Sequence, residues 1–197
     1  MQVRQTTERE PRPARFPKPC RSEKRKKMKQ EKLEQDCYYH IYNRGINGGP
    51  IFKSNENKSY FLKLINKYLS NKVSILAYCL MDNHYHMAIQ VIEEEQIVIQ
   101  AFSNLFNAYA KAFNKMHNRT GSLFEKHFRR IKIGDINYLR NLIIYINTNP
   151  ESHGVTEDYK TFKYSSFQTT ISDSNDTVSM PIAKEEVINL FEDIENF

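Results

Sequence analysis

Hydrophobic residues recur with two different periods along residues 38–149, and these periods predict alternating strands and helices. Segments 38–43, 73–80, 84–91 and 128–133 are rich in aromatic and β-branched residues, which favour strands. Between them, apolar positions at steps of three and four predict helices over residues 54–69, 93–117 and 136–149. The predicted order is strand, helix, strand, strand, helix, strand, helix.

This order predicts the fold class. Antiparallel hairpins with two crossover helices are typical of an α+β protein with a ferredoxin-like (split βαβ) antiparallel sheet and packed helices. An Asp82-Asn83 turn joins segments 73–80 and 84–91 as a hairpin. Segment 73–80 is apolar on both faces, which predicts a central position in the sheet.

Charge divides the 197 residues into three parts, which we interpret as a tail, a domain and a C-terminal extension. Residues 1–35 carry a net charge of +7 and four prolines, which predicts a disordered basic tail. This tail is either an arm that adds salt-sensitive DNA affinity, or a segment with no specific role, or residues upstream of a true start at Met28. Residues 36–170 form the domain and carry +5, and residues 171–197 carry −6.

The C-terminal extension predicts a linker followed by a short helix that Pro181 opens. Its apolar stripe is Val187, Leu190, Phe191, Ile194 and Phe197. A stripe of this regularity is expected to dock on the domain. It acts either as a cover for core surface or as an acidic gate that competes with DNA for the basic surface.

Cysteine count and hydropathy bear on the compartment. The three cysteines are odd in number and lack paired metal-ligand spacing, which indicates reduced thiols. No run of apolar residues is long enough for a membrane span, and the N-terminus lacks the apolar core of a signal peptide. We therefore expect a cytoplasmic protein without a membrane partner.

Two histidines in segment 84–91 are the first candidate for chemistry. His84 and His86 are two residues apart on a predicted strand, so their side chains project from the same face. Neutral imidazoles placed in this way can bind one metal ion. The alternative is a pair of ordinary core or surface histidines.

The helix predicted over residues 136–149 carries the second candidate. Tyr138, Leu142, Tyr145 and Asn149 follow one another at steps of four, three and four, next to a purely apolar stripe. Tyr145 and Asn149 are one turn apart and point the same way. Without a partner site, Tyr145 would be an ordinary core or boundary aromatic residue.

Short motifs along residues 37–168 carry a resemblance to a known family. They are residues 39–45 (YHIYNRG), 75–81 (ILAYCLM), 83–86 (NHYH), 119–124 (RTGSLF), 145–150 (YINTNP) and 164–167 (YSSF). In this order and spacing, the chain resembles the REP-associated tyrosine transposases, within the single-tyrosine HUH class of insertion-sequence transposases. Asp82 replaces the proline that is usual in relatives, and Tyr85 replaces an aliphatic residue. Neither change removes a catalytic group.

The resemblance implies a function and a set of site residues. It implies that His84, His86 and Asn149 hold one divalent metal, Mg²⁺ or Mn²⁺, and that Tyr145 is the nucleophile. The reaction would be cleavage and rejoining of single-stranded DNA with hairpin or palindromic ends, through a 5′-phosphotyrosine. Relatives of this class act as monomers or as homodimers, and the sequence leaves both open.

Several alternatives remain open beside this hypothesis. Tyr138 is the rival nucleophile on the same stripe. The chain could be a catalytically inactive, domesticated nucleic-acid-binding module of the same fold, or a zinc hydrolase that uses the histidines with Cys37 or Cys79. His40 and His127 are interpreted as structural or DNA-contacting residues. The candidate DNA phosphate contacts are Arg44, Arg129, Arg130 and Lys132.

Overall fold

A four-stranded antiparallel sheet forms the centre of the protein. The computed structural model describes residues 30–172 and 180–191. The strands are β1 (Tyr38–Arg44), β2 (Val73–Leu80), β3 (His84–Val91) and β4 (Arg129–Ile133). Their order across the sheet is β2-β3-β1-β4, with every neighbouring pair antiparallel. The predicted α+β class and antiparallel sheet are confirmed.

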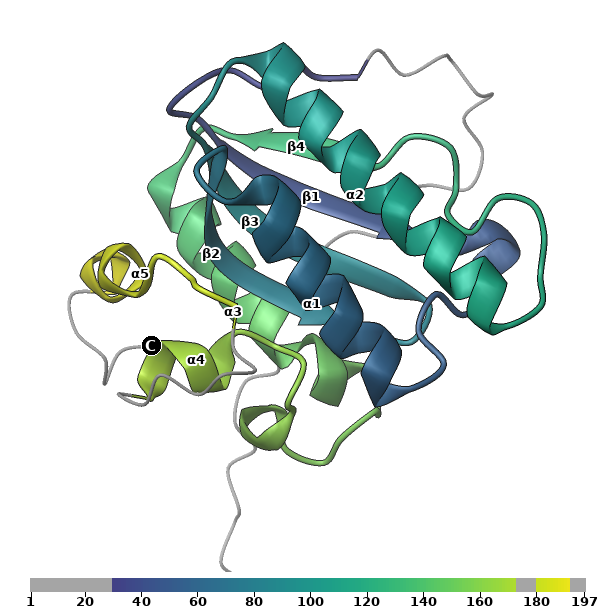
Figure 1. Cartoon of the computed structure of the whole chain (residues 1–197). Coiled ribbons are helices and arrows are strands. Elements are labelled where there is room, and N and C mark those ends of the chain that lie inside the picture. Colours follow the sequence, from purple (N-terminus) through teal and green to yellow (C-terminus); the bar gives the residue numbers. More distant parts are fainter. Residues whose placement is uncertain (1–29, 173–179, 192–197) are drawn as a thin grey trace, which may run out of the picture.

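Three helices cover the two faces of this sheet (Figure 1). Helices α1 (Asn55–Leu69) and α2 (Glu95–Met116) lie on one face, and α3 (Ile136–Ser152) lies on the other. Ser54 and Asp135 begin α1 and α3, because their side chains accept the backbone N–H groups of Asn57 and Tyr138 at 3.4 Å and 2.8 Å. The remaining elements are short: η1 (Ile46–Gly48), η2 (Tyr159–Thr161), α4 (Phe167–Ile171) and α5 (Lys184–Leu190).

Alternation along the strands separates two hydrophobic cores. Tyr39 and Ile41 of β1, with Tyr85 and Met87 of β3, point toward α1 and α2. Residues of opposite parity point toward α3, where Ala88 packs with the helix residues Leu139, Leu142, Ile143 and Ile146. His84 and His86 share the parity of Ala88 and therefore lie on the α3 face.

Strand β2 lies at an edge of the sheet, so the prediction of a central position was wrong. Its apolar residues are buried because helices cover both faces and later parts of the chain cover its outer edge. In β2, the N–H of Leu80 donates to the carbonyl of Tyr164 at 2.9 Å. The carbonyl of Ile75, also in β2, accepts the N–H of Ala183 at 2.8 Å. An edge protected in this way shows the same apolar pattern as a central strand.

Helix α3 continues past the position where the sequence predicted its end. It runs through Pro150 to Ser152, and the N–H of His153 donates to the carbonyl of Asn149 at 3.1 Å. Proline removes a single backbone donor, and near the end of a helix this loss is small compared with the packing of the buried Pro150 ring. The additional turn places His153 next to Asn149 on the same helix face.

Residues 30–36 pack against the domain beside β4 and α2. Leu33 is fully buried, and its N–H donates to the Glu95 carboxylate at 3.0 Å. The Glu31 carboxylate accepts the N–H of Lys132 at the outer edge of β4. The last residues of the predicted 1–35 tail therefore belong to the domain, and residues 1–29 lie outside the described part.

The C-terminal segment docks on the α3 side of the sheet, as its apolar stripe predicted. Val187 and Phe191 are buried in the core beneath α3. The Tyr38 hydroxyl donates to the Glu186 carboxylate at 2.8 Å. Ile194 and Phe197 lie outside the described residues. Within residues 30–172 and 180–191, no helix has both the length and the hydrophobicity needed to cross a membrane.

Candidate active site

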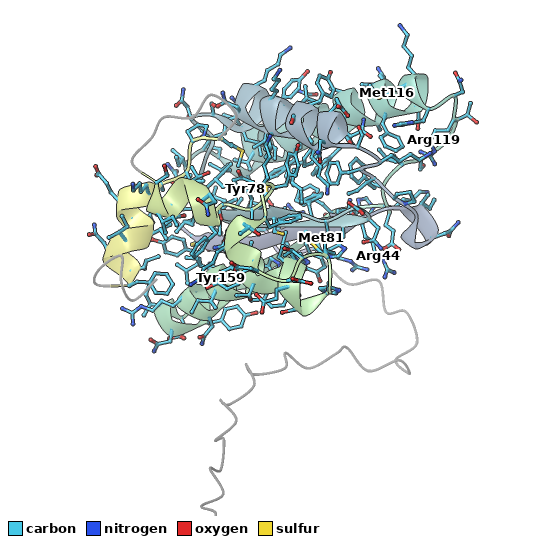
Figure 2. All side chains as sticks on the ribbon, turned by 90° about the horizontal axis from the view of Figure 1, so that it is seen from below. Arg44, Tyr78, Met81, Met116, Arg119 and Tyr159 are labelled. Atoms are coloured by element: carbon cyan, nitrogen blue, oxygen red, sulfur yellow. The ribbon has the colours of Figure 1, made fainter. Side chains whose placement is uncertain are left out.

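The two histidines of β3 lie at the start of the strand, on the face that α3 covers. Their ring centroids are 5.1 Å apart and nearly perpendicular. The antiparallel register places Arg44 opposite His84 and Tyr42 opposite His86. Figure 2 shows Arg44 and Met81 at the same end of the molecule, and the Met81 N–H donates to the His84 carbonyl. The site therefore lies at one end of the sheet.

Each histidine is held through its Nδ1 atom. His84 Nδ1 lies 2.6 Å from Asn83 Oδ1, which can only accept, so this nitrogen carries the proton. His86 Nδ1 lies 2.9 Å from His40 Nε2. Because both Nδ1 atoms are engaged, the Nε2 atoms are the nitrogens left to bind a metal. Anchoring of the second ring nitrogen in this way is the usual arrangement around metal-bound histidines.

Burial keeps these imidazoles neutral. It lowers the pKa of His40 to about 4. Burial lowers the pKa of His86 well below its ordinary value, and the neighbouring His40, His84 and His153 lower it further. The pKa of His84 is also lowered, first by burial and then by His153. Neutral imidazole is the form that binds metal ions, so the histidines are ready for coordination at neutral pH.

The Asn83 side chain that holds His84 is itself held by a glycine-rich loop. The carbonyl of Asn83 accepts the N–H of Gly45 at 2.8 Å, and its Nδ2 donates to the Gly48 carbonyl at 3.4 Å. A Cβ atom at Gly45 would lie 1.9 Å from the backbone oxygen of Gly49. Only glycine therefore allows the two ends of this loop to approach and support Asn83.

Helix α3 brings Tyr145 and Asn149 to the histidines. The Tyr145 and His86 ring centroids are 5.7 Å apart in an edge-on arrangement. Asn149 is fully buried beside His84, close enough to raise the pKa of that imidazole, although neither polar atom of its amide meets the geometry of a hydrogen bond. A buried amide without a well-formed partner is costly, which makes Asn149 a candidate ligand residue.

These residues fit a divalent metal. Two neutral imidazole nitrogens and the Asn149 amide oxygen would supply three protein ligands. In the part of the chain that the structure describes, no cluster of three or more His, Cys, Asp or Glu side chains is arranged to hold a metal. The zinc alternative with Cys37 or Cys79 therefore has no supporting geometry in these residues, and Asn149 is the candidate third ligand.

Two further histidines lie beside the site, and the sequence prediction had interpreted His40 as structural or DNA-contacting and had not named His153. The contact between His40 and His86 could have been found from strand parity, because His40 shares the α3 face of β1. The His153 ring centroid lies 5.6 Å from that of His84. Its spacing of four from Asn149 was visible in the sequence, but the expected helix end at Pro150 concealed it.

The four predicted DNA contacts separate into two groups. Arg44 is exposed, pairs with Glu125 at 2.7 Å, and lowers the pKa of His84. Arg129 is exposed and lies opposite Tyr42 on the α3 face. Arg130 and Lys132 have the other parity. The structure therefore brings only Arg44 and Arg129 to the site.

Arg130 and Lys132 contact acidic or amide side chains of α2 and of residues 30–36, which we call the strap. The Arg130 side chain is 8% exposed and lies 3.8 Å from the Glu95 carboxylate. Lys132 Nζ lies 2.6 Å from the Glu34 carboxylate. Their predicted role as DNA phosphate contacts stays a prediction.

The sheet and the histidine–tyrosine–asparagine cluster together define an α+β protein with a candidate metal site and a candidate tyrosine nucleophile. Residues 34–149 match the family model described as "Transposase IS200 like". This match covers more than half of the chain, so the chain belongs to the IS200-like transposase family. The resemblance to that class seen in the sequence is confirmed.

Individual relatives agree with this family. The chain is 26% identical over 134 residues to a putative REP-associated tyrosine transposase of Haemophilus influenzae, an alignment that covers 59% of this chain and 76% of the relative. A solved REP-associated tyrosine transposase bound to a REP hairpin has a TM-score of 0.59 and 16% identity, covering 74% of this chain and 85% of that one. At this identity the structural likeness supports the fold.

Proposed function

We propose that this transposase is a metal-dependent DNA strand transferase that cleaves and rejoins hairpin-bearing single-stranded DNA. Tyr145 is the nucleophile, and His84, His86 and Asn149 hold Mg²⁺ or Mn²⁺. One observation carries the proposal: a single face of α3 brings Tyr145 against His86 and the unpartnered Asn149 amide against His84. This arrangement supports a single site that would combine the nucleophile with three metal ligands.

The proposed reaction is a transesterification. The Tyr145 oxygen attacks the scissile phosphorus, the bond from phosphorus to the 3′-oxygen breaks, and the phenol proton is released as the 3′-hydroxyl forms. When bound, the metal polarises the phosphate and stabilises negative charge on its oxygens. The phosphodiester energy is kept in the 5′-phosphotyrosine, so a 3′-hydroxyl can reverse the step and rejoin strands.

The residues around the metal ligands have supporting roles. Asn83 and His40 orient His84 and His86 so that both Nε2 atoms are available. Arg44 and Arg129 at the same end of the sheet are placed to contact DNA phosphates. A hairpin is the natural first substrate to test, because the solved relative is described as bound to one.

A covalent adduct tests this proposal directly. Incubation of the protein with labelled hairpin DNA and Mn²⁺ should give a product that survives denaturation and carries the label on the protein. Tyr145→Phe should abolish the adduct and change hairpin affinity only a few-fold. Tyr138→Phe is the matched control on the same helix and should keep the adduct.

Two outcomes would overturn parts of the proposal. If the Tyr145→Phe variant still forms the adduct and the Tyr138→Phe variant does not, Tyr138 is the nucleophile. If the protein binds the hairpin but forms no adduct with any divalent metal tested, the inactive, domesticated binding module is favoured. The intact His84, His86, Tyr145 and Asn149 argue against that module.

A further inference from the structure

A buried polar cluster lies between α3 and β2, apart from the candidate metal ligands. Helix α3 lies against β2 on its face of the sheet (Figure 1). Asn147 of α3 is 2% exposed, and Ser166, which precedes α4, is fully buried. Both belong to the sequence motifs at residues 145–150 and 164–167, and the proposed chemistry gives neither of them a role. Buried polar groups are costly unless they are hydrogen-bonded, so their bonds show what the cluster holds together.

Ser166 joins the helix to the strand. Its hydroxyl donates to Asn147 Oδ1 at 2.8 Å and accepts the N–H of Tyr78 in β2 at 3.0 Å. The N–H of Ser166 donates to the Tyr78 carbonyl at 2.9 Å. Asn147 Nδ2 donates to the carbonyl of Ile143, one turn earlier in α3, at 3.0 Å. We call Asn147, Ser166 and the Tyr78 backbone the latch, and each side-chain polar atom in it has a partner.

Two asparagines of α3, two residues apart, are both buried but differ in their partners. Asn147 has both amide atoms in hydrogen bonds, whereas the Asn149 amide lies against His84 without a well-formed bond. A fully satisfied buried network makes the structure around it rigid, because its bonds are directional. The first amide is therefore suited to hold the helix, and the second to bind a ligand.

Directional bonds matter here because a small rotation of α3 would disturb the site. Four apolar side chains hold the helix on the sheet by contacts that are not directional: Leu139, Leu142, Ile143 and Ile146. A helix with its side chains has a radius of about 5–6 Å, so a rotation of about 10° moves a side-chain end by about 1 Å. Metal ligands must keep their distances within about 0.2 Å. Such a rotation would therefore take Asn149 and Tyr145 out of place.

We infer that Asn147 and Ser166 are positioning residues, whose hydrogen bond fixes the rotation of α3 on the sheet. The latch thereby holds Tyr145 and Asn149 against the two histidines of β3. The inference rests on the proposed function, which assigns the nucleophile and the metal ligands. A purely structural latch would change the stability of the protein and leave the geometry of the site as it is.

The first measurement uses the metal-free protein. The ring centroids of Tyr145 and His86 are 5.7 Å apart, so protons of the two rings should give a nuclear Overhauser effect. Asn147→Leu and Ser166→Ala each remove the bond between helix and strand. Both should weaken this effect by about threefold, because it falls steeply when the rings separate by about 1 Å. Ser166→Thr keeps the hydroxyl and should match wild type.

The second measurement links the position of α3 to function. Electron paramagnetic resonance of free Mn²⁺ should give a dissociation constant about tenfold higher for Asn147→Leu than for wild type. With saturating Mn²⁺ and hairpin, adduct formation should be about 100-fold slower, because a misplacement of about 1 Å costs about that factor. Hairpin affinity with a chelator present should equal that of wild type.

Ile143→Val is the matched control for stability. It removes one buried carbon from the same helix and keeps the backbone carbonyl that Asn147 bonds. The urea midpoint of this control should fall, while its ring contact, Mn²⁺ affinity and adduct rate should equal those of wild type. If Ile143→Val loses Mn²⁺ affinity as Asn147→Leu does, any destabilisation of α3 is sufficient and the inference is overturned.

Other results would also overturn the inference. Wild-type ring contact and Mn²⁺ affinity in both Asn147→Leu and Ser166→Ala would do so, as would a loss in Ser166→Thr equal to that in Ser166→Ala. If Asn147→Leu does not fold, Ser166→Ala decides by the same measurements, and failure of both to fold would make the latch purely structural. If wild type binds no Mn²⁺ and forms no adduct, but the latch variants lose the ring contact, the proposed chemistry fails and the latch stands.

Discussion

At the scale of single residues, the site depends on atoms that do not themselves face the metal. His84 and His86 each engage Nδ1 with a neighbour, Asn83 or His40. The Asn83 oxygen can only accept, which leaves the His84 Nε2 lone pair free, and His86 has the same tautomer when its Nδ1 donates to His40 Nε2. His40 is 8% exposed and also stacks on His86, with ring centroids 5.1 Å apart. Sequence motifs identify the candidate ligands, but only the folded register identifies the residues that support them.

We expect His40 to be a positioning residue for metal binding. His40→Phe keeps an aromatic ring but removes the nitrogen that meets His86 Nδ1, so Mn²⁺ affinity should fall by about 10- to 100-fold. Electron paramagnetic resonance of free Mn²⁺ measures this affinity without catalysis. His40→Gln places a polar atom near the lost Nε2 position and should recover much of the affinity. Equal Mn²⁺ affinity in all three proteins would show that the contact is only structural.

The low pKa of His40 predicts acid sensitivity of the metal-free protein. Its folded pKa is about 4 and its ordinary value is 6.5, so the unfolded chain binds more protons between these values. The stability contributed by neutral His40 is therefore full above pH 6.5 and is lost as the pH falls toward 4. His40 should contribute about 2 kcal/mol to the stability lost in urea unfolding between about pH 7.5 and pH 5, in addition to the losses from His84 and His86. His40→Gln should therefore show a loss smaller by about that amount. A pH-independent unfolding free energy would contradict this.

At the scale of elements, helix α3 carries two of the four candidate site residues, and it also shows what the sequence could not predict. Tyr145 and Asn149 share a face because side chains four residues apart lie on the same side of a helix, and the sequence predicted this. The end of α3 was not predictable, because the packing of Pro150 outweighs the loss of one backbone hydrogen bond. The same limit applied to β2, where an edge covered by other segments looked like a central strand.

The unpartnered amide of Asn149 predicts a conflict between stability and function. Asn149→Leu replaces a buried amide, which lies against His84 without a well-formed hydrogen bond, with an apolar group of similar size. The free energy of unfolding without metal should rise by about 1 kcal/mol, while Mn²⁺ affinity falls sharply. Denaturant unfolding with a chelator and a Mn²⁺ titration measure the two effects. A loss of stability in the metal-free variant would mean that the amide has a structural role.

At the scale of the whole molecule, local periodicity predicted the strands, the main helices and two separate pairs, His84 with His86 and Tyr145 with Asn149. The family resemblance is what joined the two pairs into one site. Local periodicity could not predict contacts that depend on distant segments meeting. The strap at residues 30–36 pairs with β4 and α2, and α5 covers β2 from more than a hundred residues away. Arg130 and Lys132 looked like phosphate contacts because the sequence does not show which acidic residues meet them.

The position of α5 favours a cover over an acidic gate. Glu186 meets Tyr38, which pairs with Gln90 at the opposite end of β1 from Arg44 and His84. Six residues of strand span about 20 Å, which is beyond the Debye length at physiological salt. The acidic side chains that the structure describes on α5 are therefore too far from the site for strong competition with DNA.

This position leads to a prediction for the C-terminal segment. Val187→Ala removes buried apolar surface beneath α3 and should lower the free energy of unfolding by about 2 kcal/mol, with hairpin affinity unchanged at temperatures where the variant is folded. The double variant Glu185→Gln, Glu186→Gln removes charge without unpacking the core, and its hairpin affinity should equal that of wild type at low salt. Thermal unfolding and anisotropy at low and high salt measure both effects. Stronger hairpin binding by the double variant at low salt alone would restore the acidic gate, because only a charge that acts on the DNA surface produces that pattern.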